Sequence, residues 1–535
     1  MNSSLWYKNI VLYQVYVRAF CDSNADGHGD LAGVTQKLDY LKELGINCIW
    51  LMPTYPSPLK DDGYDIADFY SVHPDFGTLD DFKTLIAEAH KRDLKIITDL
   101  VVNHTSDMHP WFQAARADRN SPYRDYYVWS DTDQKYSDAR IIFIDTEPSN
   151  WTWDEMAGQY YWHRFYASQP DLNYDSPALR NEMLQVQRFW LDLGIDGFRV
   201  DAVPYLIERE GTNCENLPET HVFLKEMRRV IDEEYTDRVL LCEANQWPKD
   251  VLAYFGNDDE FQMAFNFPLM PRIYMSLYDA DKTPIQWALE NTPAIPKNAQ
   301  WCTFLRNHDE LTLEMVTEEE RQHMWQAYAP DPKMRLNLGI RRRLAPLLEN
   351  DIRKICLANA ILFSLPGSPV IYYGDEIGMG DNIDLFDRNG VRTPMQWDAS
   401  QNSGFSKADQ LYAPIINMDP YSPSMVNVAD QQKDENSLWS SVRNMIQIRN
   451  QNVVFGTGEL ILLQTSKAEV LAYTRKDVNE TIFVINNLSD LAQEITLNIV
   501  SEKQKLKNLF TGNSFDLREN QLLLSLAPYQ YLWLS

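Results

Sequence analysis

Short, almost wholly apolar runs alternate with longer amphipathic stretches through most of the chain. Apolar residues recur every three or four positions from 31 onwards, which predicts a helix over 31–45 that Gly45 ends. The run 94–104 is continuous and rich in β-branched residues, as is typical of a parallel strand buried on both faces. Strands are expected over 10–20, 46–53, 94–104, 196–203, 238–244, 261–267, 301–310 and 367–376. The intervening helices are expected over 31–45, 79–93 (capped by Thr78), 179–194, 221–235 and about 284–291.

This alternation predicts an α/β fold, a (β/α)8 TIM barrel, because eight strand–helix units gather their polar residues at the carboxyl ends of the strands. The alternation breaks in a stretch rich in Trp, Tyr, Asp, Ser and Pro that is too long for a connecting loop, which predicts a small inserted domain B after strand three. After a helix over 437–451, alternating apolar runs predict a C-terminal antiparallel β-sandwich. The predicted boundaries are 1–104 and 175–451 for the barrel, 105–174 for the inserted domain and 452–535 for the C-terminal domain.

The charge balance narrows the range of partners. With 49 Lys and Arg against 77 Asp and Glu, the 535-residue chain carries a formal net charge of −28, which argues against a nucleic-acid partner. No apolar run approaches the roughly 18–20 residues that span a bilayer, and the N-terminal sequence lacks the pattern of a signal peptide. The six cysteines are scattered without paired spacing, which predicts reduced, buried thiols. We expect a cytoplasmic protein with no membrane or nucleic-acid partner; whether it forms a homo-oligomer is open.

Residues 196–203, DGFRVDAV, place a cation and a carboxylate at the end of an apolar run. In a strand, residues two apart point to the same face, so Arg199 and Asp201 would stand side by side. A neighbouring cation favours the ionised form of a carboxylate, which a carboxylate nucleophile requires. On these two residues alone, a structural ion pair is the more frequent explanation.

Acidic residues end three separate predicted strands, at Asp201, Glu243 and Asp309. Cleavage of a glycosidic bond with retention requires one carboxylate as nucleophile and a second as general acid/base, roughly 5–5.5 Å apart. Glu243 follows the apolar residues VLLC, and partial desolvation there would raise its pKa for acid catalysis. His308 and His104 are candidate polar clamps on a sugar ring. The ordered set points to sugar chemistry more strongly than any single member.

Four segments at these strand ends resemble the signature segments of the α-amylase family of glycoside hydrolases. They are VVNH (101–104), GFRVDAV (197–203), EANQWP (243–248) and FLRNHDE (304–310). The resemblance covers essentially the whole chain, including the insertion after strand three and the terminal sandwich. It implies Asp201 as nucleophile, Glu243 as general acid/base and Asp309 as the carboxylate that binds sugar hydroxyls and favours the oxocarbenium-like state. The matches to the family's helper residues are Arg199, His104 and His308.

The segments DDGYDI (61–66) and DRNGVRTPMQWD (387–398) resemble those with which family members hold a terminal glucose. The resemblance implies that Asp61 and Arg392 pair across the pocket and close it behind the non-reducing end of the sugar, with Tyr64 stacked beneath the ring. Such a blind pocket favours small sugars over long glucans. The alternative is a salt bridge that only staples two loops together.

Three longer segments closely resemble the branch of the family that converts maltose into trehalose. They are 208–221, 328–350 and 374–397. The implied reaction on this disaccharide substrate is an intramolecular transglycosylation, and therefore an isomerisation. Asp201 attacks the anomeric carbon of maltose while Glu243 protonates the departing oxygen, and the freed glucose then turns and attacks the glucosyl-enzyme.

This reaction needs no organic cofactor, but it must exclude water, which would divert the intermediate to glucose. The segment 312–350 is a candidate lid, although its basic, aromatic part is equally compatible with a solvated helix pair. One alternative is an α-glucosidase-type hydrolase of maltose or sucrose. Another is a non-catalytic sugar-binding or transporter-associated protein, against which the retained carboxylates argue.

Two structural sites for calcium or magnesium are also predicted. The loop DSNADGHGD (22–30) resembles the opening of a calcium loop, without the distant glutamate at the usual twelfth position. Its oxygen ligands would come from Asp22, Asn24, Asp26, Asp30 and the carbonyl of His28. The alternative for this loop is a polar turn without a metal. The second site, which the resemblance places between the inserted domain and the barrel, would use Asn103, Asp171, Glu208 and the carbonyls of Tyr205 and Leu206.

Overall fold

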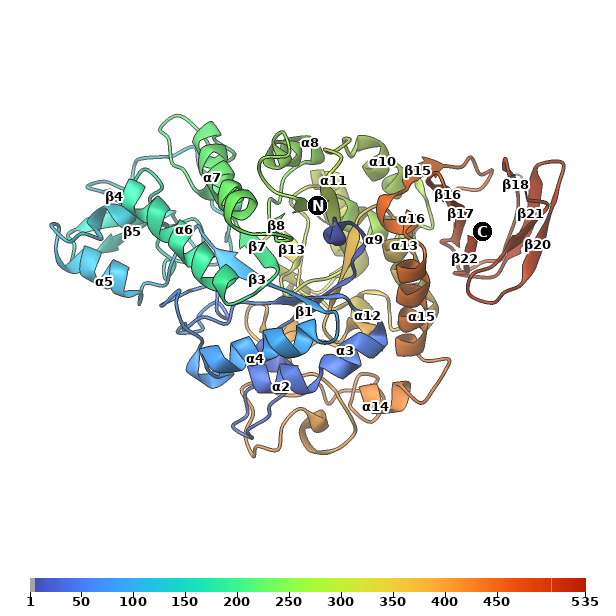
Figure 1. Cartoon of the computed structure of the whole chain (residues 1–535), viewed down its shortest axis with the longest axis horizontal. Coiled ribbons are helices and arrows are strands. Elements are labelled where there is room, and N and C mark those ends of the chain that lie inside the picture. Colours follow the sequence, from blue (N-terminus) through green and yellow to red (C-terminus); the bar gives the residue numbers. More distant parts are fainter. Residues whose placement is uncertain (1–4, 502) are drawn as a thin grey trace.

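Eight parallel strands close into a barrel at the centre of the molecule (Figure 1). The structure is a computed structural model that describes residues 5–501 and 503–535, so residues 1–4 of the first predicted barrel segment and residue 502 lie outside it. The strands are β1 (Leu12–Val15), β2 (Cys48–Leu51), β3 (Lys95–Val101), β7 (Gly197–Asp201), β8 (Val239–Cys242), β9 (Met263–Phe265), β10 (Gln300–Phe304) and β14 (Ser368–Tyr372). Their order around the barrel is β1-β14-β10-β9-β8-β7-β3-β2. All eight predicted strands are confirmed, and each is shorter than its apolar run.

The barrel strands are buried along almost their whole length, as their nearly continuous apolar sequences require. The strand predicted over 10–20 was too long, because the chain leaves β1 after Val15 and forms the short helix α1 (Val17–Phe20). Asp201 is the last residue of β7, and Glu243 directly follows β8. Since all eight strands run in the same direction, these two acids meet at one end of the barrel.

Helices surround the barrel (Figure 1). They are α2 (Leu31–Gln36), α3 (Leu38–Leu44), α4 (Leu79–His90), α6 (Pro177–Asp192), α7 (Pro218–Glu234), α8 (Pro248–Val251), α9 (Leu269–Asp279), α10 (Thr283–Asn291), α13 (Ile352–Ser364), α14 (Val428–Gln431) and α15 (Leu438–Gln451). Thr78 caps α4 in a capping box with Asp81, and Gly45 ends α3 with a φ of 100°. The helix predicted over 31–45 is divided at Lys37 into α2 and α3.

Two insertions extend the loops that follow barrel strands. The first, between β3 and α6, contains α5 (Pro110–Ala117) and a three-stranded sheet of order β4-β6-β5. Its strands are β4 (Trp129–Ser130), β5 (Trp151–Asp154) and β6 (Gln159–Trp162). The second, between β10 and α13, contains β11 (Leu311–Thr312), α11 (Glu318–Tyr328), β12 (Arg335–Leu336), β13 (Gly339–Ile340) and α12 (Leu344–Leu347). The candidate lid therefore contains a small sheet of order β11-β13-β12 besides its long helix α11 and the short helix α12, so it is not a simple helix pair.

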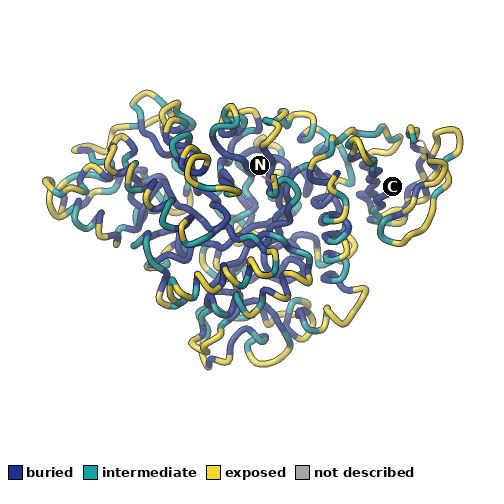
Figure 2. Tube along the Cα trace, in the orientation of Figure 1, coloured by how far each residue is buried: buried dark blue, intermediate teal, exposed yellow. Residues whose placement is uncertain are grey.

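Two four-stranded antiparallel sheets form the C-terminal domain, at the opposite end of the molecule from the first insertion (Figure 1). One sheet contains β15 (Glu459–Leu462), β16 (Val470–Lys476), β17 (Thr481–Asn487) and β22 (Tyr531–Leu534). The other contains β18 (Gln493–Asn498), β19 (Lys505–Lys507), β20 (Ser514–Arg518) and β21 (Gln521–Leu526). Apolar side chains of both sheets share one core, distinct from that of the barrel. Figure 2 shows buried backbone, in dark blue, within this domain. On β16, Arg475 donates to the carbonyls of Ser364 and Gly458, which fixes the domain against the end of α13.

The six cysteines are buried free thiols, as their scattered spacing predicted. Among the described residues, no helix combines the length and the apolar character that crossing a membrane requires.

Candidate active site

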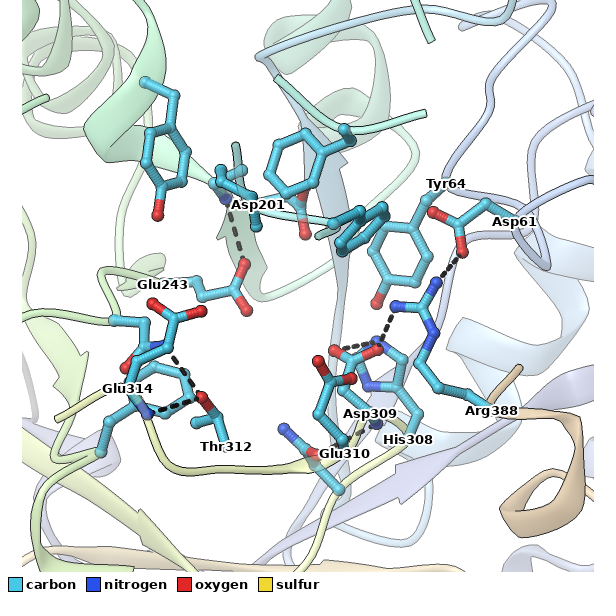
Figure 3. Close-up of a pocket in the computed structure, with 18 of the residues that line it drawn as sticks. Asp61, Tyr64, Asp201, Glu243, His308, Asp309, Glu310, Thr312, Glu314 and Arg388 are labelled. Atoms are coloured by element: carbon cyan, nitrogen blue, oxygen red, sulfur yellow. Dashed lines mark hydrogen bonds and ion pairs between the residues drawn. The ribbon is translucent and has the colours of Figure 1, made fainter. Parts of the chain in front are cut away.

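A cavity of about 830 Å³ opens where the barrel strands end (Figure 3). Seven of the predicted catalytic and sugar-binding residues line it: Asp61, Tyr64, His104, Asp201, Glu243, His308 and Asp309. The two insertions contribute further lining residues. Phe143 and Phe165 come from the first insertion, and Thr312 and Glu314 from the second.

Arg199 holds the reacting carboxylates together. Because β7 alternates its side chains, Arg199 and Asp201 point the same way and form the predicted ion pair. The other guanidinium nitrogen, Nη2, lies 2.6 Å from Glu243 Oε1. Arg199 is 1% exposed, so these pairs are shielded from water. One buried cation thus joins the ends of two neighbouring strands.

The third partner of Arg199, Asp99 on β3, was missed by sequence reasoning. Its Oδ1 lies 2.6 Å from Arg199 Nη1, and its Oδ2 accepts a hydrogen bond from Trp50 Nε1 at 2.7 Å. Burial raises its pKa to about 6, against the lowering effect of Arg199. An aspartate inside an otherwise apolar strand was the available signal, since a buried acid requires a partner.

The pKa of Asp201 is raised to about 6, because burial outweighs the opposing effect of Arg199. The lowering effect expected from the neighbouring cation is present, but it is smaller than the effect of burial, which the sequence prediction left out. Asp201 is nevertheless mainly ionised at pH 7. The residue that follows it, Ala202, has a left-handed conformation with φ 52°, and its backbone N–H donates to Glu243 Oε2 at 3.1 Å. This turn therefore orients the second acid next to the first.

The pKa of Glu243 is raised to about 8. Burial is the largest cause, and the negative charges of Asp201 and Asp309 add to it against the effect of Arg199. The direction is the one predicted from the apolar residues before Glu243. At neutral pH the site thus holds a protonated glutamic acid beside an ionised aspartate, which is the combination that a general acid and a nucleophile require.

Asp309 lies in the loop beyond β10, where two arginines converge on it. Its Oδ1 is 2.7 Å from Arg388 Nη1 and 3.1 Å from Arg392 Nη2. Burial opposes its charge, but His308 and these arginines outweigh burial and hold the pKa of Asp309 well below its ordinary range. Burial lowers the pKa of His308 itself, so at pH 7 the lasting positive charge comes from the arginines. Asp309 therefore remains ionised throughout the physiological pH range.

The predicted pairing of Asp61 with Arg392 is wrong. Asp61 Oδ1 lies 2.5 Å from Arg388 Nη2, and Arg392 Nη1 lies 2.6 Å from Oδ2 of the next residue, Asp62 (Figure 3 shows the first pair). The consecutive residues Asp61 and Asp62 thus form ion pairs with two arginines that are four residues apart in sequence. The choice between them depends on the conformation of both loops, which spacing alone does not reveal. Arg388 lines the pocket and was not predicted.

Aromatic and imidazole rings form the floor of the pocket. Tyr64 stacks on His308 with ring centroids 5.1 Å apart and planes within 9°. Gln14 Nε2 lies 2.7 Å from His308 Nδ1 and acts as its donor, so the neutral imidazole carries its proton on Nε2, 3.0 Å from Asp309 Oδ2. His104 also lines the pocket, and burial lowers its pKa to about 3. Both histidines are therefore neutral hydrogen-bonding groups.

Ion pairs tie the two insertions together at the edge of the pocket. Arg140 of the first insertion lies 2.9 Å from Glu314 of the second and 2.8 Å from Glu215, in the loop after β7. Further contacts link Asp145 Oδ2 with the backbone N–H of Asn337, at 2.7 Å. These charged residues belong to no sequence motif, and their partners lie far away in the chain, so no pattern in the sequence pointed to them.

The second predicted metal site contains buried oxygen atoms without hydrogen-bond partners. Asn103 Oδ1, Asp171 Oδ2 and Glu208 Oε1 are all buried and unpartnered. The amide of Asn103 donates to Asp171 Oδ1 at 2.9 Å, and the charge of Asp171 acts on Glu208, so these residues lie together. Neutral and anionic oxygens are the ligands that Ca²⁺ and Mg²⁺ prefer. Within the described residues no cluster of three or more His, Cys, Asp or Glu could hold a metal. The set discussed here contains only two carboxylates beside the asparagine and would complete its ligands with carbonyl oxygens.

The loop 22–30 is a polar turn. Asp22 Oδ1 accepts from the backbone N–H groups of Asn24 and Ala25, and Asp26 Oδ1 accepts from that of His28. Asp30 caps α2 through Gly33. These bonds account for the acidic residues without a cation, which favours the alternative raised from the sequence, and a metal in this loop stays a prediction.

Family comparisons agree with this architecture. The chain matches the family described as alpha amylase, catalytic domain, over residues 14–331 and 340–458. It also matches the family described as maltogenic amylase, C-terminal domain, over residues 460–533.

Three relatives are similar to this chain in sequence along most of their length. "Trehalose synthase/amylase TreS" of Mycolicibacterium smegmatis is 59% identical over 509 residues, covering 92% of this chain and 86% of that protein. "Trehalose synthase" of Pimelobacter is 52% identical over 545 residues, covering 99% and 95%. "Oligo-1,6-glucosidase" of Parageobacillus thermoglucosidasius is 32% identical over 594 residues, covering 98% of both.

Solved structures give the same picture. The trehalulose synthase MutB from Pseudomonas mesoacidophila has a TM-score of 0.81 at 30% identity over 99% of both chains. An inactive MutB variant in complex with isomaltulose has a TM-score of 0.80 at 29% identity, again over 99% of both.

Proposed function

This chain belongs to the α-amylase family, and we propose that it interconverts maltose and trehalose by intramolecular transglycosylation with retention. The observation that carries the proposal is the pair Asp201 and Glu243 on one buried guanidinium, with pKa values of about 6 and 8. The names of relatives 52% and 59% identical support the choice of sugars.

In the first half of the reaction, an Asp201 carboxylate oxygen bonds to the anomeric carbon of the non-reducing glucose. Glu243 gives its proton to the glycosidic oxygen as that bond breaks. Asp309, kept ionised by Arg388 and Arg392, accepts hydrogen bonds from the hydroxyls of this glucose and stabilises the positive charge that develops on its ring. The released glucose remains in the pocket, beside a glucosyl-Asp201 intermediate.

In the second half, the retained glucose turns so that its anomeric hydroxyl faces the intermediate. Glu243, now a carboxylate, removes the proton of this hydroxyl while the oxygen attacks the anomeric carbon and Asp201 departs. One glycosidic bond replaces another, so no external energy source is needed. The Arg140 ion pairs with Glu215 and Glu314 support this step, because they hold the insertions together and limit the entry of water.

Incubation with maltose and chromatography of the products tests the proposal. We expect trehalose as the main product and glucose as a minor one, with the same final ratio when trehalose is the starting sugar. Asp201→Asn is the matched control, and its turnover should fall by about 10⁴-fold or more. Glucose as the sole product would refute isomerisation and identify a hydrolase.

An α-glucosidase-type hydrolase of small α-glucosides is the second candidate. The observation that favours it is the 32% identity to an oligo-1,6-glucosidase over 98% of both chains. The chemistry of both candidates is the same until the intermediate has formed, and only the acceptor differs, so the product analysis separates them.

We also infer a structural cation, calcium or magnesium, at Asn103, Asp171 and Glu208. The three unpartnered buried oxygens support this inference. Tyr205 and Leu206, in the segment leading to Glu208, would add carbonyl ligands. The cation would stabilise the junction of the first insertion with the barrel and would take no part in the reaction.

We also propose that the protein works in the cytoplasm. The six buried free thiols support a reducing compartment.

A further inference from the structure

A second cavity, here called the rear cavity, lies behind the wall of the catalytic pocket. It has a volume of about 690 Å³ that includes space open to solvent, and the lining residues that matter here are Tyr16, Arg18, Asp62, Phe386, Arg392 and Tyr412. The other side of the same wall presents Asp61 and Arg388 to the catalytic pocket (Figure 3). The two ion pairs of the wall thus face two different cavities.

The lining of the rear cavity combines aromatic faces with fixed polar groups. The Arg18 guanidinium lies 4.7 Å from the centroid of the Tyr412 ring. Its Nε donates to His28 Nδ1 at 3.3 Å, whereas its Nη1 is 3.7 Å from Asp62 Oδ1, which is longer than a hydrogen bond, so the Nη groups retain donors for a ligand. Phe386 is 74% exposed at this cavity and offers a free ring face. Ring faces with a few oriented donors and acceptors suit a neutral sugar, whose C–H face is apolar and whose edge is polar.

The rear cavity is coupled to the catalytic carboxylates through Arg392. Asp62 Oδ2 lies 2.6 Å from Arg392 Nη1, and Arg392 Nη2 lies 3.1 Å from Asp309 Oδ1. The Tyr412 hydroxyl donates to the backbone carbonyl of Arg392 at 2.5 Å. A hydroxyl group that competed for Asp62 or displaced Tyr412 would therefore change the orientation of Arg392 and its hold on Asp309.

We propose that the rear cavity is a second hexose site, which binds glucose and slows turnover from behind the pocket wall. The choice of glucose rests on the proposed function, because side hydrolysis releases this sugar. Binding there leaves the catalytic pocket free for the disaccharide, so it lowers the maximal rate instead of competing with the substrate.

Inhibition kinetics test the effect on the rate. Initial rates of trehalose formation are measured at several maltose and glucose concentrations, each variant being normalised to its own rate without glucose. We expect glucose to lower the maximal rate at saturating maltose. In Phe386→Ala and in Arg18→Met, the glucose concentration that halves this rate should rise about fivefold or more. Tyr278→Ala, which truncates an aromatic ring that is 55% exposed on α9, is the control and should not shift it. Purely competitive inhibition of the parent protein, or equal shifts in Tyr278→Ala, would overturn the proposal.

Binding stoichiometry keeps this test separate from that of the proposed function. Calorimetric titration of Asp201→Asn with glucose should show a site that adding Phe386→Ala weakens, besides the binding that the catalytic pocket itself offers to hexoses. A titration that Phe386→Ala leaves unchanged overturns the rear cavity as a hexose site, whatever the products from maltose are. A site weakened by Phe386→Ala in a protein that makes only glucose from maltose would instead leave the rear site standing and refute isomerisation.

Discussion

At the scale of single residues, the reaction depends on two carboxyl groups with different protonation states. Asp201 must be ionised and Glu243 protonated, and their pKa values of about 6 and 8 define the window in which both conditions hold. We therefore predict a bell-shaped dependence of kcat/KM on pH, with an acidic limb near 6 and an alkaline limb near 8. Initial rates from pH 5 to 9 measure it. A flat profile across this range would contradict the assignment of the two roles.

The raised pKa of Glu243 also has a consequence for stability. The unfolded chain loses this proton near pH 4.5, whereas the folded protein retains it up to about pH 8. Relative to the unfolded chain, the folded state therefore loses stability as pH rises from 4.5 through 8. Glu243→Gln cannot lose a proton at this position. The thermal midpoint of Glu243→Gln minus that of the parent protein should therefore increase as the pH rises from 5 to 8. Glu233→Gln, at an exposed position of α7, is the control. The same difference in midpoint at both pH values would contradict the prediction.

At the scale of elements, the sequence was sufficient for the barrel but not for the choice of side-chain partners. The strand β7 was predictable because an apolar run ends in Arg199 and Asp201 with the period of a strand. The Asp61–Arg392 pairing failed because two adjacent acids face two nearby arginines, and only loop geometry decides between them. The role of Asp99 was not predicted for a related reason, since its ion-pair partner Arg199 lies on the neighbouring strand β7.

The two insertions act as one element through Arg140. We predict that Arg140→Met increases the fraction of maltose converted to glucose by about twofold or more, because loosening the contacts to Glu215 and Glu314 admits water to the intermediate. Chromatography of the products gives this fraction directly. Arg116→Met, which loses an ion pair with Asp154 inside the first insertion, is the matched control. An unchanged fraction in Arg140→Met would show that the ion pairs do not seal the pocket.

At the scale of the whole molecule, function depends on contacts between segments that are distant in sequence. Asn103 ends the third strand region, Asp171 closes the first insertion and Glu208 follows β7. The resemblance to a known family brought these residues together, whereas spacing alone could not, because they are separated by dozens of residues. Their unpartnered oxygens are the structural reason to expect that a cation joins the insertion to the barrel.

Removal of this cation should weaken the fold. Without it, the carboxylates of Asp171 and Glu208 would be buried next to each other with only partial compensation, which is costly. A ligand that binds only the folded state stabilises it by mass action, so chelation followed by gel filtration should lower the thermal midpoint by about 3 °C or more, and added Ca²⁺ or Mg²⁺ should restore it. In Glu208→Gln the effect of the cation should be much smaller. Asp175→Asn, which loses a surface ion pair with Arg209, should respond to the cation as the parent protein does. A midpoint that chelation leaves unchanged, with no metal detected by elemental analysis, would refute the site and would require these oxygens to be satisfied by water.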